Sequence, residues 1–274
     1  MKTLIPKDFM RLAKEGESLD KAAKSECALS RIDLLVVLGV LAFLALIRLP
    51  ALAHDRANSH RFVCAENLRR LAVAWQMYAD DHDGKLVPNT FTAPTNWVGP
   101  IGLEGPDAQL RMITNGLLFP YSRSADFYRC PADQRRTAVR SRLFENARSY
   151  SMNAWIGEGA AGWVVGGPPF QIQTHLSLIR QPDQTFVFIE EHADSINDGA
   201  FIVDVSSTLA NARFIDFPAA YHTLGANLGF ADGSVRYRQW VDPRTVIITQ
   251  FPSPGPQPNN PDIAWMQRVT TYRR

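Results

Sequence analysis

The sequence predicts an α+β fold in which one long N-terminal α-helix packs on an antiparallel β-sheet head with long loops. Three observations indicate this fold. Residues 34–47 form an uncharged apolar run, and apolar residues recur at helical spacing between positions 64 and 78. Strand-like runs rich in Phe, Val and Ile occupy much of the second half, with turn residues between them. A helix that covers one face of such a sheet gives two layers around one core.

The composition is that of a folded protein. The 274 residues are 46% hydrophobic and 20% charged, which argues against a disordered chain. The formal net charge of +2 lacks the clustered basic excess that phosphate binding needs, so we expect no nucleic-acid partner. The mean hydropathy of -0.15 excludes a polytopic membrane protein but is compatible with a single anchor.

The apolar run LLVVLGVLAFLALI would span about 21 Å as a helix, less than the ~30 Å core of a bilayer. Extension to Ala53 supplies the missing length and places Arg48 where its side chain can reach the headgroups. A buried core helix and the apolar region of a signal peptide are the alternatives for a run of this length. The residues before Leu29 are mostly polar, which is unlike an ordinary signal peptide. We therefore expect an anchoring helix over residues 29–53.

Several motifs in the chain match a known family in the same order. Residues 28–37, ALSRIDLLVV, resemble the type IV prepilin signature, a small residue followed by F-T-L-I-E-L-L-V-V. His222 is followed by nine residues and then Asp232-Gly233, which matches the H-x9-DG signature of bacterial prepilin-like proteins. Further similar segments lie at 64–71, 128–133, 149–153 and 191–199. The chain therefore resembles the bacterial type IV prepilin-like and type II secretion pseudopilin family over nearly all of residues 29–240.

This resemblance implies a processing step and a membrane-bound fold. A prepilin peptidase would cut between Ala28 and Leu29 on the cytoplasmic side and methylate the new N-terminus. The fold would be pilin-like, with the first half of the helix embedded in the membrane. Asp33 stands where the family has a Glu that neutralises the amine of a neighbouring subunit, and Pro50 stands where pilins often carry a helix-kinking proline. Ala28 and Arg31 depart from the family pattern, so an uncut single-pass protein with a cytoplasmic tail is the alternative.

The implied function is that of a structural subunit rather than an enzyme, one that assembles into a type II secretion or type IV pilus-like filament. The implied location is the inner membrane, single-pass, with the C-terminal head in the periplasm. The implied partners are the prepilin peptidase, copies of the chain and other pseudopilins, the inner-membrane assembly platform and membrane lipid. The expected parts are a leader (1–28), a transmembrane and assembly helix (29–53), a head (54–251) with the H-x9-DG region (222–233), and a Pro-rich linker and tail (252–274).

The sequence contains three cysteines, Cys27, Cys64 and Cys130, so one of them is left over in any disulfide scheme. Cleavage after Ala28 would remove Cys27 and leave the other two beyond the membrane, where disulfides persist. We therefore predict a bridge between Cys64 and Cys130, and two buried free cysteines are the alternative. The sequence has no C-x-x-C pair, which argues against a zinc ribbon or a thioredoxin-like site.

Within the head, the helical stripe predicts that the helix continues to about Asp80 and ends before Gly84, which supplies a turn. The stripe consists of Cys64, Leu68, Leu71, Trp75 and Tyr78. The predicted strands are 185–189, 200–205, 212–217, 226–231, 235–240 and 246–251. Asp232-Gly233 predicts a hairpin with a type I′ turn, because Asp-Gly accepts the positive φ that this turn requires. We also expect the C-terminal tail to dock through Trp265 and Met266.

Two polar clusters are candidate metal sites. The acidic loop Asp80, Asp81 and Asp83 offers oxygen ligands of the kind that calcium prefers, although helix capping on a solvated turn is the favoured interpretation. The second cluster holds natural transition-metal ligands: Glu190, Glu191, His192, Asp194, Asn197 and Asp198, with His222 and Asp232. The favoured alternative here is a loop in which His222 and Asp232 hold turn backbone by hydrogen bonds. We expect no cofactor, except that the acidic loop could bind calcium.

Two other functions compete with the structural subunit. One is a membrane-anchored periplasmic binding module for carbohydrate, in which Trp97, Trp155 and Trp163 stack on sugar rings. The other is an anchored metal-dependent hydrolase built on Glu191, His192 and His222. The G-x-G-x-x-G match at 157–162 lacks the preceding strand and following helix of a dinucleotide site, and it predicts a flexible loop.

Overall fold

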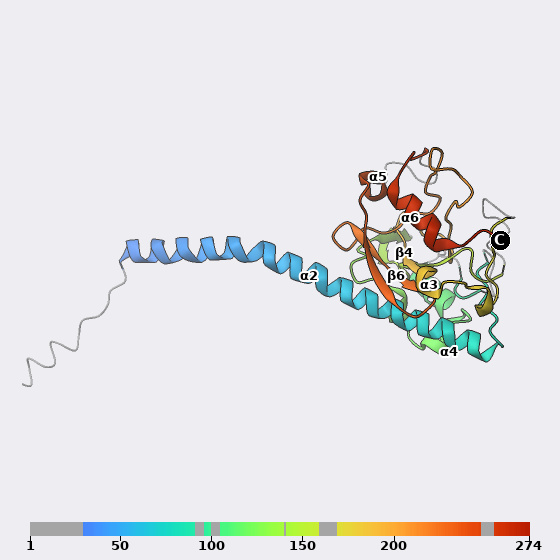
Figure 1. The fold of residues 1–274 in the computed structure, drawn as a ribbon. Coiled ribbons are helices and arrows are strands. Elements are labelled where there is room, and N and C mark those ends of the chain that lie inside the picture. Colours follow the sequence, from blue (N-terminus) through green and yellow to red (C-terminus); the bar gives the residue numbers. More distant parts are fainter. Residues whose placement is uncertain (1–29, 91–95, 100–104, 140, 159–168, 248–254) are drawn as a thin grey trace, which may run out of the picture. The chain divides into compact units, whose positions relative to one another are not determined.

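The computed structural model describes residues 30–90, 96–99, 105–139, 141–158, 169–247 and 255–274 (Figure 1). Within the described ranges, the side chains of residues 45–58, 137 and 139 are outside the description. The chain divides into two compact units, Met1–Ala53 and His54–Arg274. The predicted cleavage site at Ala28 and Leu29 lies outside the described residues, and the predicted kink at Pro50 lies outside the described side chains.

Helix α2 (Arg31–Asp81) contributes residues to both units. Its first turn is closed by a reciprocal pair of hydrogen bonds between Ser30 and Asp33. The Ser30 backbone N–H donates to the Asp33 carboxylate at 2.9 Å, and the Asp33 N–H donates to the Ser30 hydroxyl at 3.1 Å. This arrangement is a capping box with Asp in the position usually taken by Glu. At the other end, Gly84 adopts a φ of 83°, and its N–H donates to the Ala79 carbonyl at 2.8 Å.

Among the residues that the structure describes, no helix combines the length and the apolarity needed to cross a bilayer. The expected single-pass inner-membrane location, with a membrane-embedded helix over 29–53, is therefore wrong. The physical reason is length. The uncharged apolar run 34–47 spans about 21 Å as a helix, against the ~30 Å of a hydrocarbon core.

The head contains a five-stranded sheet in the order β5-β3-β4-β6-β7. Its strands are β3 (Tyr150–Asn153), β4 (Phe186–Glu190), β5 (Ala200–Phe201), β6 (Gly225–Phe230) and β7 (Val235–Gln239). Neighbouring strands are antiparallel except β3 and β5, which are parallel. The fold is thus α+β with a mixed sheet, and the expected pilin-like helix on an antiparallel sheet is wrong. The parallel pair arises because the chain passes through β4 before it returns to the far edge of β3.

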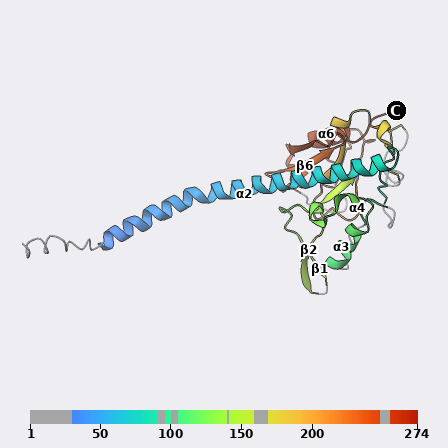
Figure 2. The ribbon, with the colours of Figure 1, turned by 90° about the horizontal axis from the view of Figure 1, so that it is seen from below.

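Two apolar clusters fill the head, one on each side of the sheet. The first contains the inner face of α2 with Phe188 and Met152, and the second contains helix α6 (Pro261–Thr270) with Phe186 and Leu228. Strand β4 contributes to both clusters, so all five of its residues are buried. Figure 2 shows the later part of α2 alongside β6.

The remaining elements are short and surround this core. A two-stranded sheet consists of β1 (Arg136–Val139) and β2 (Arg142–Glu145), paired antiparallel. The other helices are α3 (Pro106–Thr114), α4 (Phe119–Ser122) and α5 (Pro243–Val246), with 3-10 turns η1 (Ala125–Tyr128), η3 (Leu176–Leu178) and η4 (Pro182–Gln184).

Several predicted elements agree with the structure. All five residues of the stripe from Cys64 to Tyr78 are buried against the sheet, which confirms that interpretation. The β6–β7 hairpin is also confirmed. Its turn is not type I′, however, because Gly233 has a positive φ but Asp232 does not. The Asp232 carboxylate instead accepts the backbone N–H of Ser234 at 2.9 Å, which holds Asp232 in an Asx turn.

Other predicted elements differ from the structure. Strand β5 is only Ala200–Phe201, and the predicted strand 212–217 is reduced to an isolated bridge between Val203 and Phe214. Residue 246 ends α5 instead of beginning a strand. The C-terminal tail forms a helix, α6, with Met266 fully buried and Trp265 edge-on to Trp240. The tail therefore docks as expected, but as part of the core.

Candidate functional site

The N-terminal part of α2 carries apolar side chains on every side. All residues from 31 to 44 are exposed. The exposed large apolar side chains of this segment are Ile32, Leu34, Leu35, Val36, Val37, Leu38, Val40, Leu41, Phe43 and Leu44. A helix that is apolar all round is normally covered by other apolar groups. We call residues 32–44 the apolar segment.

Asp33 is the only acidic residue in the apolar segment. Hydrogen bonds from the backbone and hydroxyl of Ser30 lower the pKa of its carboxyl. Its side chain is exposed and caps the helix of its own chain. The family resemblance implies that this carboxylate neutralises the N-terminal amine of a neighbouring subunit.

A buried polar group lies in the head where α2 meets the sheet. Cys64 on α2, Cys130 after η1, Glu190 at the end of β4 and His222 before β6 are all at most 1% exposed. One ligand atom of each lies within 4.8 Å of those of the other three. We call these four residues the Cys–Glu–His cluster. The structure joins Cys64 and Cys130 in a disulfide with a Cα–Cα distance of 5.3 Å, the pairing that the sequence analysis predicts.

Glu190 organises this cluster through three hydrogen bonds. One carboxylate oxygen faces His222 Nε2 at 3.0 Å and accepts the Asn227 side-chain amide at 3.1 Å. The other oxygen accepts the Asn227 backbone N–H at 2.8 Å. His222 Nε2 also lies 3.3 Å from Cys130 Sγ. The polar partners of this ring are therefore members of the cluster, since His222 Nδ1 has none among the described atoms.

The loop before β6 fixes the position of His222. Its N–H donates to the Gly225 carbonyl, and its carbonyl accepts the Tyr237 hydroxyl at 2.6 Å. Thr223 and Leu224 both have positive φ, so the chain turns sharply after the histidine. Asp232, the second part of the H-x9-DG motif, lies in the exposed hairpin turn and is not in the cluster.

A second buried group surrounds Arg148, which is 2% exposed. Its guanidinium donates to the Tyr150 carbonyl at 2.5 Å, to the Ser151 hydroxyl at 2.8 Å and to the Asp198 carbonyl. Glu191 and Asp198 interact with it electrostatically, and Asp216 interacts in turn with both carboxylates. We call Arg148, Glu191, Asp198 and Asp216 the Arg148 network. It is largely structural, because its donors go to backbone and hydroxyl groups of β3 and the loop before β5.

Burial controls the protonation of the Arg148 network. It raises the pKa of Asp216 to about 8, raises the pKa of Glu191 well above its usual value, and raises the pKa of Asp198. It also lowers the pKa of Arg148 to about 10. Removing charges from water is costly, so the carboxyl groups are driven toward their neutral forms.

We expect the stability of the protein to fall as pH rises from 5 to 8. The folded-state pKa of Asp216 lies above its unfolded value, so its stabilising contribution is full below about pH 4 and is lost as pH rises through about 8. The expected slope is roughly 1 kcal/mol per pH unit. Thermal unfolding at several pH values, followed by tryptophan fluorescence, measures this slope. The Asp216→Asn variant should have a smaller slope than the wild type.

The matched control for this experiment is Asp204→Asn. Burial acts to raise the pKa of Asp204, but hydrogen bonds from Ser207 and Ser206 lower it overall. This carboxyl is therefore ionised in both folded and unfolded chains between pH 5 and 8, and its replacement should leave the slope unchanged. Equal slopes in the wild type and Asp216→Asn would contradict the prediction.

Of the predicted metal ligands, Glu190 and His222 meet in the Cys–Glu–His cluster, whereas Asp81, Asp83, Glu191 and His192 do not join them. Asp81 accepts a hydrogen bond from Tyr121 at 3.0 Å at the end of α2, and the Asp83 carbonyl contacts His175 at 2.7 Å. Glu191 belongs to the Arg148 network and binds the Ser195 hydroxyl at 2.8 Å. His192 faces Asp194, and burial lowers its pKa. Within the described part of the chain, the one group of three or more metal-ligand side chains is the Cys–Glu–His cluster, which shares none of these four residues.

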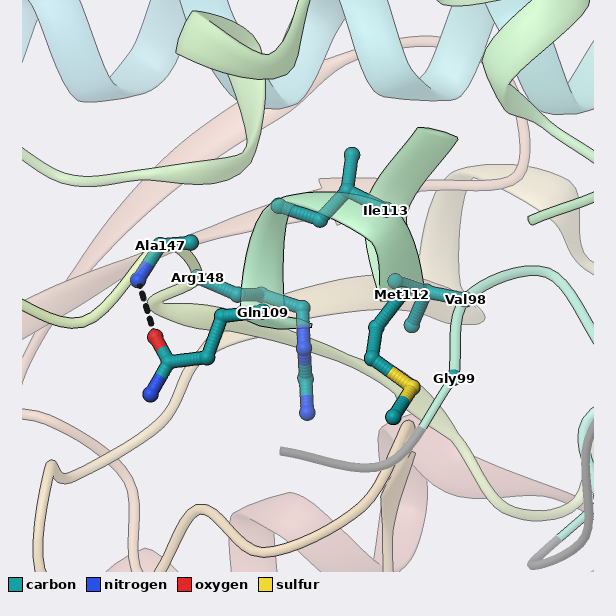
Figure 3. A pocket seen from close by; sticks show the side chains of 7 residues that line it. All are labelled: Val98, Gly99, Gln109, Met112, Ile113, Ala147 and Arg148. Atoms are coloured by element: carbon teal, nitrogen blue, oxygen red, sulfur yellow. Dashed lines mark hydrogen bonds between the residues drawn. The ribbon is translucent and has the colours of Figure 1, made fainter. Parts of the chain in front are cut away.

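Two of the three tryptophans considered for carbohydrate binding are core residues. Trp97 and Trp155 are fully buried, and their indole N–H groups donate to the Gly199 and Val203 carbonyls. Trp163 lies outside the described residues. Beside Arg148 there is a cavity of about 10 Å³, room for no more than one water molecule (Figure 3). Figure 3 also shows the hydrogen bond from the Ala147 N–H to Gln109 on α3.

Sequence reasoning missed most of these buried groups. It singled out His222 and Glu190, but it grouped Glu190 with Glu191 and did not identify Arg148. The only sequence signal was the polar segment 149–153 next to Arg148. Comparisons of the chain with family models, with curated proteins and with solved structures found no match.

Proposed function

We propose that this chain is a structural subunit that assembles with copies of itself through the apolar segment into a filament of the type II secretion or type IV pilus-like class. The observation that carries the proposal is the exposure of consecutive apolar side chains on all sides of one helix. Burial of each Leu or Val side chain contributes about 1.5–3 kcal/mol, so self-association of such a surface is strongly favoured.

The N-terminus of this helix supports a second copy as the partner. Cleavage between Ala28 and Leu29 would create an amine directly before Ser30 and Asp33. Asp33 is the one carboxylate in an otherwise apolar surface, and a carboxylate buried in an assembly is costly unless it is paired with a cation. The amine of an adjacent copy supplies that cation, which gives the assembly a register.

The experiment compares the full chain with two variants that introduce the same carboxylate. Leu38→Asp changes a residue of the apolar segment that is 53% exposed, and Val241→Asp changes a residue of the head that is 63% exposed. We expect the wild type and Val241→Asp to associate in sedimentation velocity and to form filaments in electron micrographs. Leu38→Asp should raise the concentration needed for association at least about tenfold, because one unpaired carboxylate would be buried among apolar helices.

Two outcomes would overturn the proposal. One is a wild-type chain that stays monomeric across the accessible concentration range, and the other is equal association of the two variants. The processing step has its own readout. Coproduction with an active prepilin peptidase should remove 28 residues and leave an N-methylated Leu29, as seen by mass spectrometry. An intact Met1 under those conditions would exclude processing without bearing on association.

A further inference from the structure

We propose that the Cys–Glu–His cluster binds one zinc ion when its two cysteines are reduced. Its residues come from four distant places in the chain, α2, the segment after η1, the end of β4 and the loop before β6. The structure nevertheless brings one ligand atom of each within 4.8 Å of the others, in a fully buried place. This site is independent of the apolar segment and of the proposed assembly.

The donor set matches zinc. Two cysteine sulfurs, one imidazole nitrogen and one carboxylate oxygen are ligands that tetrahedral zinc prefers. With zinc–ligand bonds of about 2.0–2.3 Å, tetrahedral geometry places nitrogen and oxygen about 3.3 Å apart, and sulfur and nitrogen about 3.5 Å apart. The structure has His222 Nε2 3.0 Å from Glu190 Oε1 and 3.3 Å from Cys130 Sγ. Shifts of a few tenths of an ångström therefore suffice for these pairs.

Neighbouring groups hold two of the ligands in place. Asn227 donates to both oxygens of Glu190, which fixes the orientation of the carboxylate. Tyr237 holds the backbone of His222 through its carbonyl. Such outer contacts orient metal ligands and support their affinity. The His222 ring has no described polar partner outside the cluster, so coordination competes with no other contact of that ring.

The disulfide and the metal are alternative states of the same two sulfurs. A dithiol reductant gives two electrons and two protons to the Cys64–Cys130 bond, which breaks into two thiols while the reductant becomes a disulfide. Each thiol then loses its proton as a sulfur–zinc bond forms, since the thiolate is the metal ligand. The two positive charges of zinc are balanced by the two thiolates, so binding adds no formal charge to this buried place.

The test uses the full chain with cobalt(II) and zinc(II) as probes, with and without a dithiol reductant. Tetrahedral cobalt bound by thiolates shows strong visible and near-ultraviolet absorption, which zinc abolishes when it displaces cobalt. We expect one cobalt per reduced chain, displacement by zinc, and no such absorption for the oxidised chain. Zinc should also raise the melting temperature of the reduced chain, because it binds the folded state.

The variants separate the site from nonspecific binding. Cys64→Ser and Cys130→Ser should each abolish the absorption, and Glu190→Gln should weaken cobalt binding about 10–100-fold. Cys27→Ser and His192→Asn are matched controls outside the cluster and should bind as the wild type does. Circular dichroism shows which variants fold, and Glu190→Gln is nearly isosteric. The proposal is overturned if the reduced, folded wild type lacks the cobalt absorption, or if folded Glu190→Gln and the cysteine variants retain it unchanged.

Discussion

Replacement of Arg148 by methionine should lower the free energy of unfolding by about 3–5 kcal/mol, because it removes the one cation of a buried network. Its guanidinium satisfies the Tyr150 and Asp198 carbonyls and the Ser151 hydroxyl. Methionine fills most of the volume but leaves these acceptors unpaired, and it also leaves Glu191 without the positive charge that opposes its raised pKa. Urea denaturation followed by tryptophan fluorescence measures the loss.

Arg142→Met is the matched control, since Arg142 is an exposed residue of β2. Surface substitutions of this kind change the free energy of unfolding by no more than about 0.5 kcal/mol. A loss of less than about 1 kcal/mol in Arg148→Met would show that β3 and the loop before β5 do not depend on the guanidinium. The pH-dependent loss of stability should also extend to higher pH in Arg148→Met, because Glu191 would hold its proton more tightly in the folded state.

Replacement of Glu190 by alanine should also lower the free energy of unfolding by about 3–5 kcal/mol with the disulfide intact. The carboxylate accepts hydrogen bonds from the backbone N–H and the side-chain amide of Asn227. It also faces His222 Nε2. Its loss leaves buried donors unpaired and a cavity at the point where α2, β4 and β6 meet. Thermal and urea denaturation of the nonreduced chain measure this effect without any contribution from metal.

Glu145→Ala is the control for Glu190→Ala. Glu145 contacts Arg129 and Arg136, but it is half exposed, and an exposed ion pair contributes at most about 1 kcal/mol. A similar loss of unfolding free energy in the two variants would mean that the buried contacts of Glu190 stabilise the fold no more than an exposed ion pair does. Chemical shifts of Asn227 and His222 in the folded Glu190→Ala chain would then show whether water replaces the carboxylate.

Local patterns in the sequence predicted the local elements. The stripe from Cys64 to Tyr78 repeats with the period of a helix, and every residue in it is buried in one core cluster with residues of the sheet. Asp232-Gly233 predicted the β6–β7 hairpin, although the Asp232 side chain rather than a positive φ shapes the turn. The strand predicted over 212–217 failed because its apolar residues pack in the core as irregular chain, with Phe214 and Phe217 in mutual contact. Burial alone does not distinguish such a segment from a strand.

The candidate site depends on contacts that periodicity does not encode. Glu190 and Glu191 are adjacent in the sequence, and this adjacency predicts that both belong to one polar cluster. Successive residues at a strand end point to opposite sides. Glu190 therefore meets His222 and Asn227, whereas Glu191 meets Ser195 and the Arg148 network. His192 lies beyond the end of β4 and faces Asp194 instead of the cluster.

The sequence by itself determined the helical stripe, the central hairpin, the apolar segment and the cysteine pair. The first three follow from residue types within a few turns of chain, and the cysteine pair follows from the cleavage after Ala28 that the family resemblance implies. Only the tertiary structure decided that β5 lies parallel to β3, that α6 completes the core, and that Cys130 and Glu190 meet His222. Those contacts join residues 32 to 92 positions apart. These contacts are stabilised by burial and hydrogen bonding that exist only once the sheet has formed, so no local sequence pattern predicts them.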